Sequence, residues 1–164
     1  MISTPSQQAF RKFAANDVAK AKQRAPKVLV DTSVLIAGIA ALKKPPIAPY
    51  NESQRVLRLC RSERFQWVLS AEILEEYKAV MKALKIRPHT AGAVINHLRA
   101  AALFVEPVSD VQLSLDPNDD CFYACALAAG ADYIVTLNTK DFPQIGRRPK
   151  ILTPAQFVQL FGES

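Results

Sequence analysis

Short apolar runs at intervals along this chain most constrain its fold, because each has the length and composition of a buried strand. Between them lie stretches whose apolar residues recur at helical spacing. Strands separated by helices need crossover connections, which join parallel strands and leave helices on both faces of the sheet. We therefore expect an α/β fold with three α/β/α layers and a central, mostly parallel sheet of about five strands. The expected strands are 27–30, 65–69, 103–105, 133–136 and 150–152.

Residues that start or stop helices divide the remaining sequence. Ser70 is expected to cap a helix, Gly130 to end one, and Pro154 to occupy the first position of the last one. Thr32 and Ser33 are expected to supply capping hydroxyls for a helix that continues from Val34. The other expected helices are 53–63, 71–85, 89–102, 121–129 and 154–161.

The net charge of +6 is unevenly distributed. Residues 1–27 hold six basic side chains and one acidic side chain, a charge of +5, whereas residues 28–164 carry only +1. We therefore divide the chain into a basic N-terminal extension (1–26), with a helix over 10–25, and one globular domain (27–164). The extension is expected to be solvated or to pack on a partner subunit. Alternatives are an arm that binds nucleic acid or a transit peptide.

Three features favour a cytoplasmic protein. The three cysteines are an odd and sparse set, which is unlike a secreted disulfide framework. The first 26 residues lack the apolar block of a secretory signal, and no apolar run approaches the ~18 residues of a membrane-spanning helix. We therefore expect no membrane association.

Acidic and amide side chains follow several of the expected strands. Because the carboxyl ends of parallel strands meet at one edge of a sheet, where ligands bind, these groups are expected to converge there. Close carboxylates repel one another unless they are protonated or hold a cation, and an all-oxygen site suits Mg²⁺ or Mn²⁺. Helix capping or simple solvation would explain each acid separately. The groups are Asp31, Glu72, Glu75, Glu76, Asp116, Asp119, Asp120, Asn138 and Asp141.

Five motifs in order make the chain recognisable over residues 27–161. The sequence resembles the PIN-domain ribonucleases, particularly the branch close to VapC-type toxins. The resemblance implies a three-layer PIN-like fold and hydrolysis of RNA with Mg²⁺ or Mn²⁺. The motifs are Val-Leu-Val-Asp31-Thr32-Ser33, Leu69-Ser-Ala-Glu-Ile-Leu-Glu-Glu76-Tyr77, Asp116-Pro-Asn-Asp119-Asp120, Gly130 to Pro143 with Thr136, Asn138 and Asp141, and Ile151-Leu-Thr-Pro154.

The resemblance also implies roles for individual residues. Asp31, Glu76 and Asp119 match the acids that bind the metal and carry catalysis, and Asp120 is the substitute for Asp119. Thr32 or Ser33, together with Thr136, would position a water or a phosphate.

The fourth acidic position departs from the family pattern. Asn138 stands where many members have aspartate, and it can ligate through its carbonyl oxygen but brings no charge. Asp141 could substitute for it.

The expected partners are RNA, a second copy of the chain in a homodimer and, for a toxin, a small antitoxin protein. Arg55, Arg58 and Arg61 are candidates for RNA contacts, although a solvated helix face explains them too. The leading hypothesis is a metal-dependent endoribonuclease that acts as the toxin of a toxin–antitoxin pair. The alternative is a catalytically weak PIN domain that binds RNA or protein, which the uncharged Asn138 favours.

Overall fold

The structure is a computed structural model that describes residues 25–40, 51–107 and 120–162. Three expectations therefore lie wholly or largely outside the described residues. They concern the helix over 10–25, the acids Asp116 and Asp119, and the N-terminal extension 1–26.

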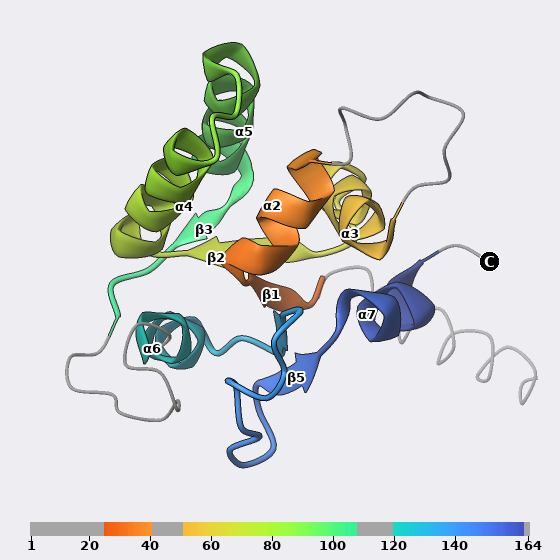
Figure 1. Ribbon diagram of the computed structural model, residues 1–164. Coiled ribbons are helices and arrows are strands. Elements are labelled where there is room, and N and C mark those ends of the chain that lie inside the picture. Colours follow the sequence, from red (N-terminus) through yellow and green to blue (C-terminus); the bar gives the residue numbers. More distant parts are fainter. Residues whose placement is uncertain (1–24, 41–50, 108–119, 163–164) are drawn as a thin grey trace, which may run out of the picture.

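Five strands form a single, entirely parallel sheet in the order β3-β2-β1-β4-β5, which confirms the expected α/β fold (Figure 1). The central strand, β1, has Val28, Leu29 and Val30 fully buried, because helices cover both faces of the sheet. The strands are β1 (Lys27–Val30), β2 (Gln66–Leu69), β3 (Leu103–Phe104), β4 (Tyr133–Val135) and β5 (Lys150–Leu152).

Helices α2 and α3 lie on one face of the sheet and α6 lies on the other (Figure 1). Ser70 caps α4 by accepting a hydrogen bond of 3.2 Å from the Ile73 amide, and Gly130 follows α6 with a φ of 62°. Such left-handed backbone favours glycine, which is why α6 ends there. The described helices are α2 (Thr32–Ala40), α3 (Glu52–Arg61), α4 (Ala71–Ala83), α5 (Pro88–Ala101), α6 (Asp120–Ala129) and α7 (Pro154–Phe161).

The expected role of Thr32 and Ser33 as helix caps is wrong. Both residues belong to the first turn of α2, whose helical hydrogen bonds begin with the Val34 and Leu35 amides donating to the Asp31 carbonyl. Their hydroxyls donate instead to carboxylates, as described below.

Two contacts set the position of the sheet edge where β1 ends. The Asp31 amide donates to the Val135 carbonyl of β4 over 2.9 Å, which continues the ladder between the two neighbouring strands. On the other side, the buried Tyr77 hydroxyl of α4 donates to the Val30 carbonyl. The residue after β1 is therefore fixed between β4 and α4.

Candidate active site

Asp31 is a buried carboxylate, 6% exposed, at the carboxyl end of the central strand. Its Oδ2 accepts two short hydrogen bonds, one from the Ser33 hydroxyl at 2.6 Å and one from the Thr136 hydroxyl at 2.8 Å. Within the part of the chain that the structure describes, Oδ1 has no hydrogen-bond partner. The hydroxyls therefore hold one oxygen of the carboxylate in place and leave the other available to a ligand.

Glu76 repeats this arrangement from a different element. It lies on α4 and is half-buried, and its Oε1 accepts a 2.7 Å hydrogen bond from the Thr32 hydroxyl of α2. Among the described residues, Oε2 makes no hydrogen bond and no ion pair. Because Thr32 and Ser33 are consecutive, the first turn of α2 holds both carboxylates at once.

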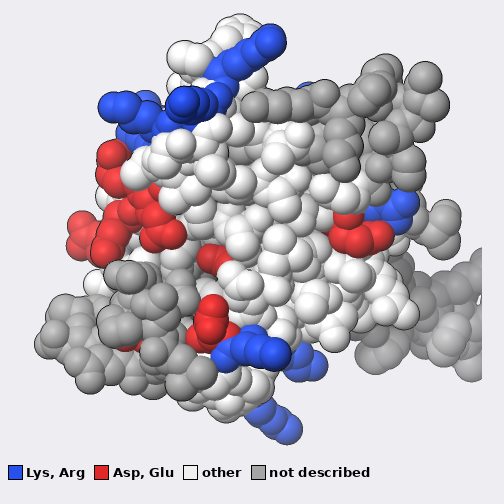
Figure 2. Space-filling model, viewed as in Figure 1, with Lys and Arg blue, Asp and Glu red and all other residues white. Residues whose placement is uncertain are grey.

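Burial and neighbouring negative charges both act on Glu76. Burial raises the pKa of Glu76 above its ordinary value, and the negative charges of Asp31 and Glu72 raise it further, whereas the Thr32 hydrogen bond lowers it. No described lysine or arginine forms an ion pair with Asp31 or Glu76. Figure 2 shows acidic side chains gathered over the beginning of α4, next to this site. The site is therefore suited to a cation.

The segment after β4 closes the site from the other side. The Thr136 hydroxyl, which donates to Asp31, accepts a 3.0 Å hydrogen bond from the Asn138 amide. The Ser33 hydroxyl accepts from the Leu137 amide at 3.3 Å. Asn138 is exposed and is linked to Asp31 only through its backbone amide and Thr136, so its role as a metal ligand stays a prediction.

Of the other expected acids, Glu72 acts on Glu76 through its charge, whereas Asp141 forms no hydrogen bond or ion pair with Asp31 or Glu76 among the described residues. Asp119 lies outside the described residues. Asp120 begins α6 and Asp141 lies in the turn after β4, where its amide donates to the Asn138 carbonyl. The described ranges contain no group of three or more Asp, Glu, His or Cys side chains that could hold a metal ion. The expected metal set therefore stays a prediction.

The three arginines proposed for RNA contacts lie on α3, away from these acids. Arg55 pairs with Glu52 over 3.6 Å, and Arg58 and Arg61 line a pocket between α2, α3 and α5. Their contact with RNA stays a prediction.

The hydrogen bonds give the three hydroxyls a function that the sequence did not reveal. Thr32, Ser33 and Thr136 were expected to position a water or a phosphate, which stays a prediction. In this structure each donates its single hydroxyl proton to a carboxylate. The direct succession of Asp31, Thr32 and Ser33 places two hydroxyls next to an acid in the sequence. Only the fold shows which hydroxyl donates to which carboxylate.

The fold is that of a parallel α/β protein, a class in which ligands bind beyond the carboxyl ends of the strands, and Asp31 lies at such an end. A comparison with protein-family models matches residues 27–140 to the PIN domain. Because this match covers more than half of the chain, the protein belongs to the PIN-domain family, a family with a nuclease fold, which confirms that part of the resemblance. A search of the curated proteins finds no match.

The bond between Thr32 and Glu76 can be tested with two substitutions. Thr32→Val keeps the shape of the side chain but removes the donor, so Glu76 loses its only described hydrogen bond. A hydrogen bond to a charged group contributes roughly 1.5–3 kcal/mol, so we expect any RNA cleavage that depends on Glu76 to fall about 10- to 150-fold. Thr32→Ser, which keeps the hydroxyl, should retain most of the activity. Equal rates of cleavage by Thr32→Val and the wild type would exclude this role for Thr32.

Proposed function

We propose that the protein is a metal-dependent endoribonuclease that hydrolyses RNA phosphodiester bonds at the site containing Asp31 and Glu76. One observation carries the proposal: two carboxylates from different elements each have one oxygen held by a hydroxyl and the other without a described partner. A purely structural acid in a protein interior normally has its hydrogen-bonding capacity satisfied.

The donor set fits a hard divalent cation. Asp31 and Glu76 offer carboxylate oxygens and Asn138 offers an amide oxygen. The pKa of Glu76 is raised mainly by burial and further by the charges of Asp31 and Glu72, and a cation would neutralise that charge. Asp31, Glu76 and Asp119 would hold Mg²⁺ or Mn²⁺, with Asn138, Asp120 or Asp141 contributing to the site. When bound, the ion supplies an activated water and stabilises the charge that develops on the phosphodiester.

The residues of the chain itself orient this site. Ser33 and Thr136 hold Asp31, and Thr32 holds Glu76, so both acids are already oriented before the substrate arrives. Pre-orientation of this kind reduces the reorganisation that the reaction would otherwise require.

Removal of divalent ions tests the proposal directly. The purified chain is incubated with a mixed RNA pool in EDTA, and then with excess Mg²⁺ or Mn²⁺. We expect cleavage only when a divalent ion is present, with new RNA ends mapped by sequencing. Cleavage that persists unchanged in EDTA would rule out metal dependence.

Asn138 favours a second candidate function, a PIN domain that binds RNA or protein with little catalysis, because it brings no charge to the fourth acidic position. Binding of the RNA pool without cleavage, at any concentration of Mn²⁺, would support this alternative.

A role as the toxin of a toxin–antitoxin pair rests on the resemblance to VapC-type toxins, as do a homodimeric state and a small antitoxin partner. A cytoplasmic location follows from the composition. In the part of the chain that the structure describes, no helix has the length and apolar character needed to cross a membrane. A short neighbouring reading frame whose product suppresses cleavage by the purified chain would support the toxin role.

A further inference from the structure

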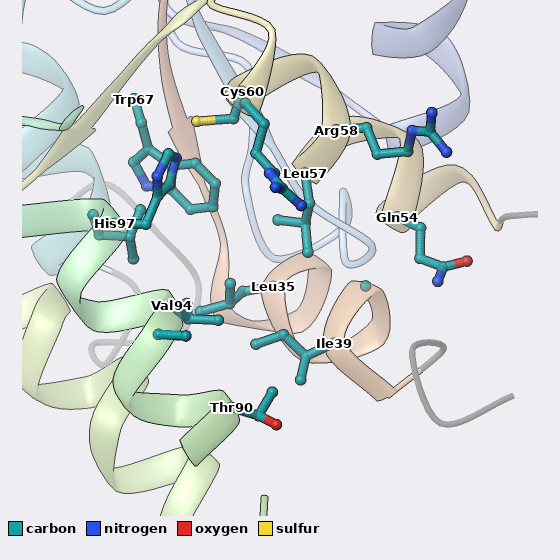
Figure 3. A pocket seen from close by; sticks show the side chains of 14 residues that line it. Leu35, Ile39, Gln54, Leu57, Arg58, Cys60, Trp67, Thr90, Val94 and His97 are labelled. Atoms are coloured by element: carbon teal, nitrogen blue, oxygen red, sulfur yellow. The ribbon is translucent and has the colours of Figure 1, made fainter. Parts of the chain in front are cut away.

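A second site lies among the helices, away from the acidic pair. A cavity of about 380 Å³ opens between α2, α3 and α5 above β2. In Figure 3, His97 and Trp67 lie at one end of this cavity and Thr90 lies at the other. Between these ends it is lined by aliphatic side chains from all three helices, namely Leu35, Ile39, Leu57 and Val94.

The cavity is distinct from the proposed nuclease site although the two share α2. Thr32 and Ser33 in the first turn of the helix contact the acids, whereas Leu35, Gly38 and Ile39 further along face the cavity. Leu35 lines the cavity and reaches Asp31 only through its backbone amide, and none of the hydroxyl-bearing residues that hold the two carboxylates lines it. A ligand here would therefore not occupy the carboxylates Asp31 and Glu76 or the hydroxyls that hold them.

The size and lining are those of a small-molecule site. Pockets for small organic ligands have volumes of roughly 300–1,000 Å³, with mostly apolar walls and a few polar groups. Cys60 belongs to the apolar wall, because burial raises the pKa of its thiol to about 11 and keeps the thiol neutral. The walls therefore fit the apolar body of a ligand.

The charged groups of the lining all have the same sign. Arg58 and Arg61 of α3 carry positive charge, and none of the described residues that line the cavity is an aspartate or glutamate. Figure 3 shows the Arg58 side chain directed away from the apolar residues. Arg61 is the other arginine of the lining, and we assign the contact with a ligand to it. A positive border on an apolar cavity complements a molecule with an apolar body and one negative group.

We propose that this cavity binds a small amphiphilic organic anion, in which an aliphatic or aromatic body fills the space between α2, α3 and α5 and a carboxylate or sulfonate contacts Arg61. The proposal is independent of the nuclease function, because it rests on the shape and charge of a different site.

Fluorescence titration of the full chain with 8-anilinonaphthalene-1-sulfonate tests the proposal, followed by displacement with decanoate and with uncharged decanol. We expect saturable binding of one probe per chain and displacement by decanoate at about tenfold lower concentration than by decanol. Arg61→Gln should weaken binding of the probe about five- to tenfold. Ala93→Phe adds volume to the cavity wall and should reduce the affinity for the probe further. Cooperative thermal unfolding of each variant is measured first, because the probe also binds partly unfolded protein.

Arg55→Gln is the matched control, because Arg55 lies on the same helix but does not line the cavity. Its affinity for the probe should equal that of the wild type. Equal losses in Arg55→Gln and Arg61→Gln, or equal displacement by decanol and decanoate, would overturn the proposal. Lack of saturable binding would overturn it too, and would leave the cavity as a surface for a protein segment.

Discussion

Asp31→Asn should reduce RNA cleavage by at least about a thousandfold while the protein stays folded. The loss corresponds to about 4 kcal/mol of transition-state stabilisation, in the range expected when a charged group that holds an essential cation is removed. Folding should survive because the asparagine Oδ1 can accept the same hydroxyl hydrogen bonds from Ser33 and Thr136. Cleavage rates at saturating Mn²⁺ and thermal unfolding are the two measurements.

Asp132→Asn provides the matched control for this prediction. Asp132 is a partly buried aspartate that lies before β4 rather than after a strand, and its oxygens accept from the Lys27 amide at 2.9 Å and pair with Arg148 at 3.1 Å. Its substitution should lower the melting temperature slightly and leave the cleavage rate unchanged. If Asp31→Asn cleaves RNA as fast as Asp132→Asn, Asp31 does not belong to the active site.

The sheet could be predicted from the sequence because each strand is a short apolar run with clear boundaries. Lys27–Val30 and Lys150–Leu152 begin and end where expected, and β4 ends at Val135, one residue before the expected end. The order of the strands required the structure. Pairing of β1 with both β2 and β4 is a long-range property, whereas residue spacing reports only local structure.

The sequence predicted which residue types form the candidate site, but not which hydroxyl would donate to which carboxylate. Asp31 and Glu76 were expected to share one sheet edge, and the structure joins them through Thr32 and Ser33. The partner of each hydroxyl depends on how α2 and α4 pack, which spacing along the chain does not encode. The cavity at Arg61 was missed for the same reason, because three separate helices form it.

Glu76→Gln should have opposite effects on activity and on stability. Cleavage should fall about a hundredfold or more, because the charge that would hold the cation is lost. In EDTA at neutral pH, however, the melting temperature should rise. Burial and the charges of Asp31 and Glu72 make the ionised form of Glu76 unfavourable in the folded protein. Glutamine removes this charge and can still accept the hydrogen bond from Thr32.

The pH dependence of the stability has a sign that follows from the raised pKa of Glu76. The pKa of Glu76 is higher in the folded state than its ordinary value, so folding favours the protonated carboxyl. The stability contributed by this group is fully present below the ordinary pKa and is lost as the pH rises through the folded-state value. The wild type and Glu76→Gln should therefore differ little at acidic pH and diverge towards neutral pH. Calorimetry of both proteins without divalent ions measures this difference.

Glu75→Gln is the control that separates this effect from a general loss of negative charge on α4. The Glu75 carboxylate accepts a 2.8 Å hydrogen bond from Lys78, and this bond, together with the charge of Lys78, lowers its pKa. Removing the charge of Glu75 should therefore lower the melting temperature slightly or leave it unchanged, and cleavage should persist. A melting temperature that rises equally in both variants would mean that repulsion along the helix, rather than the environment of Glu76, causes the effect. A gain in stability confined to Glu76→Gln, together with loss of cleavage, would show that the fold tolerates an unfavourable charge at this position because catalysis requires it.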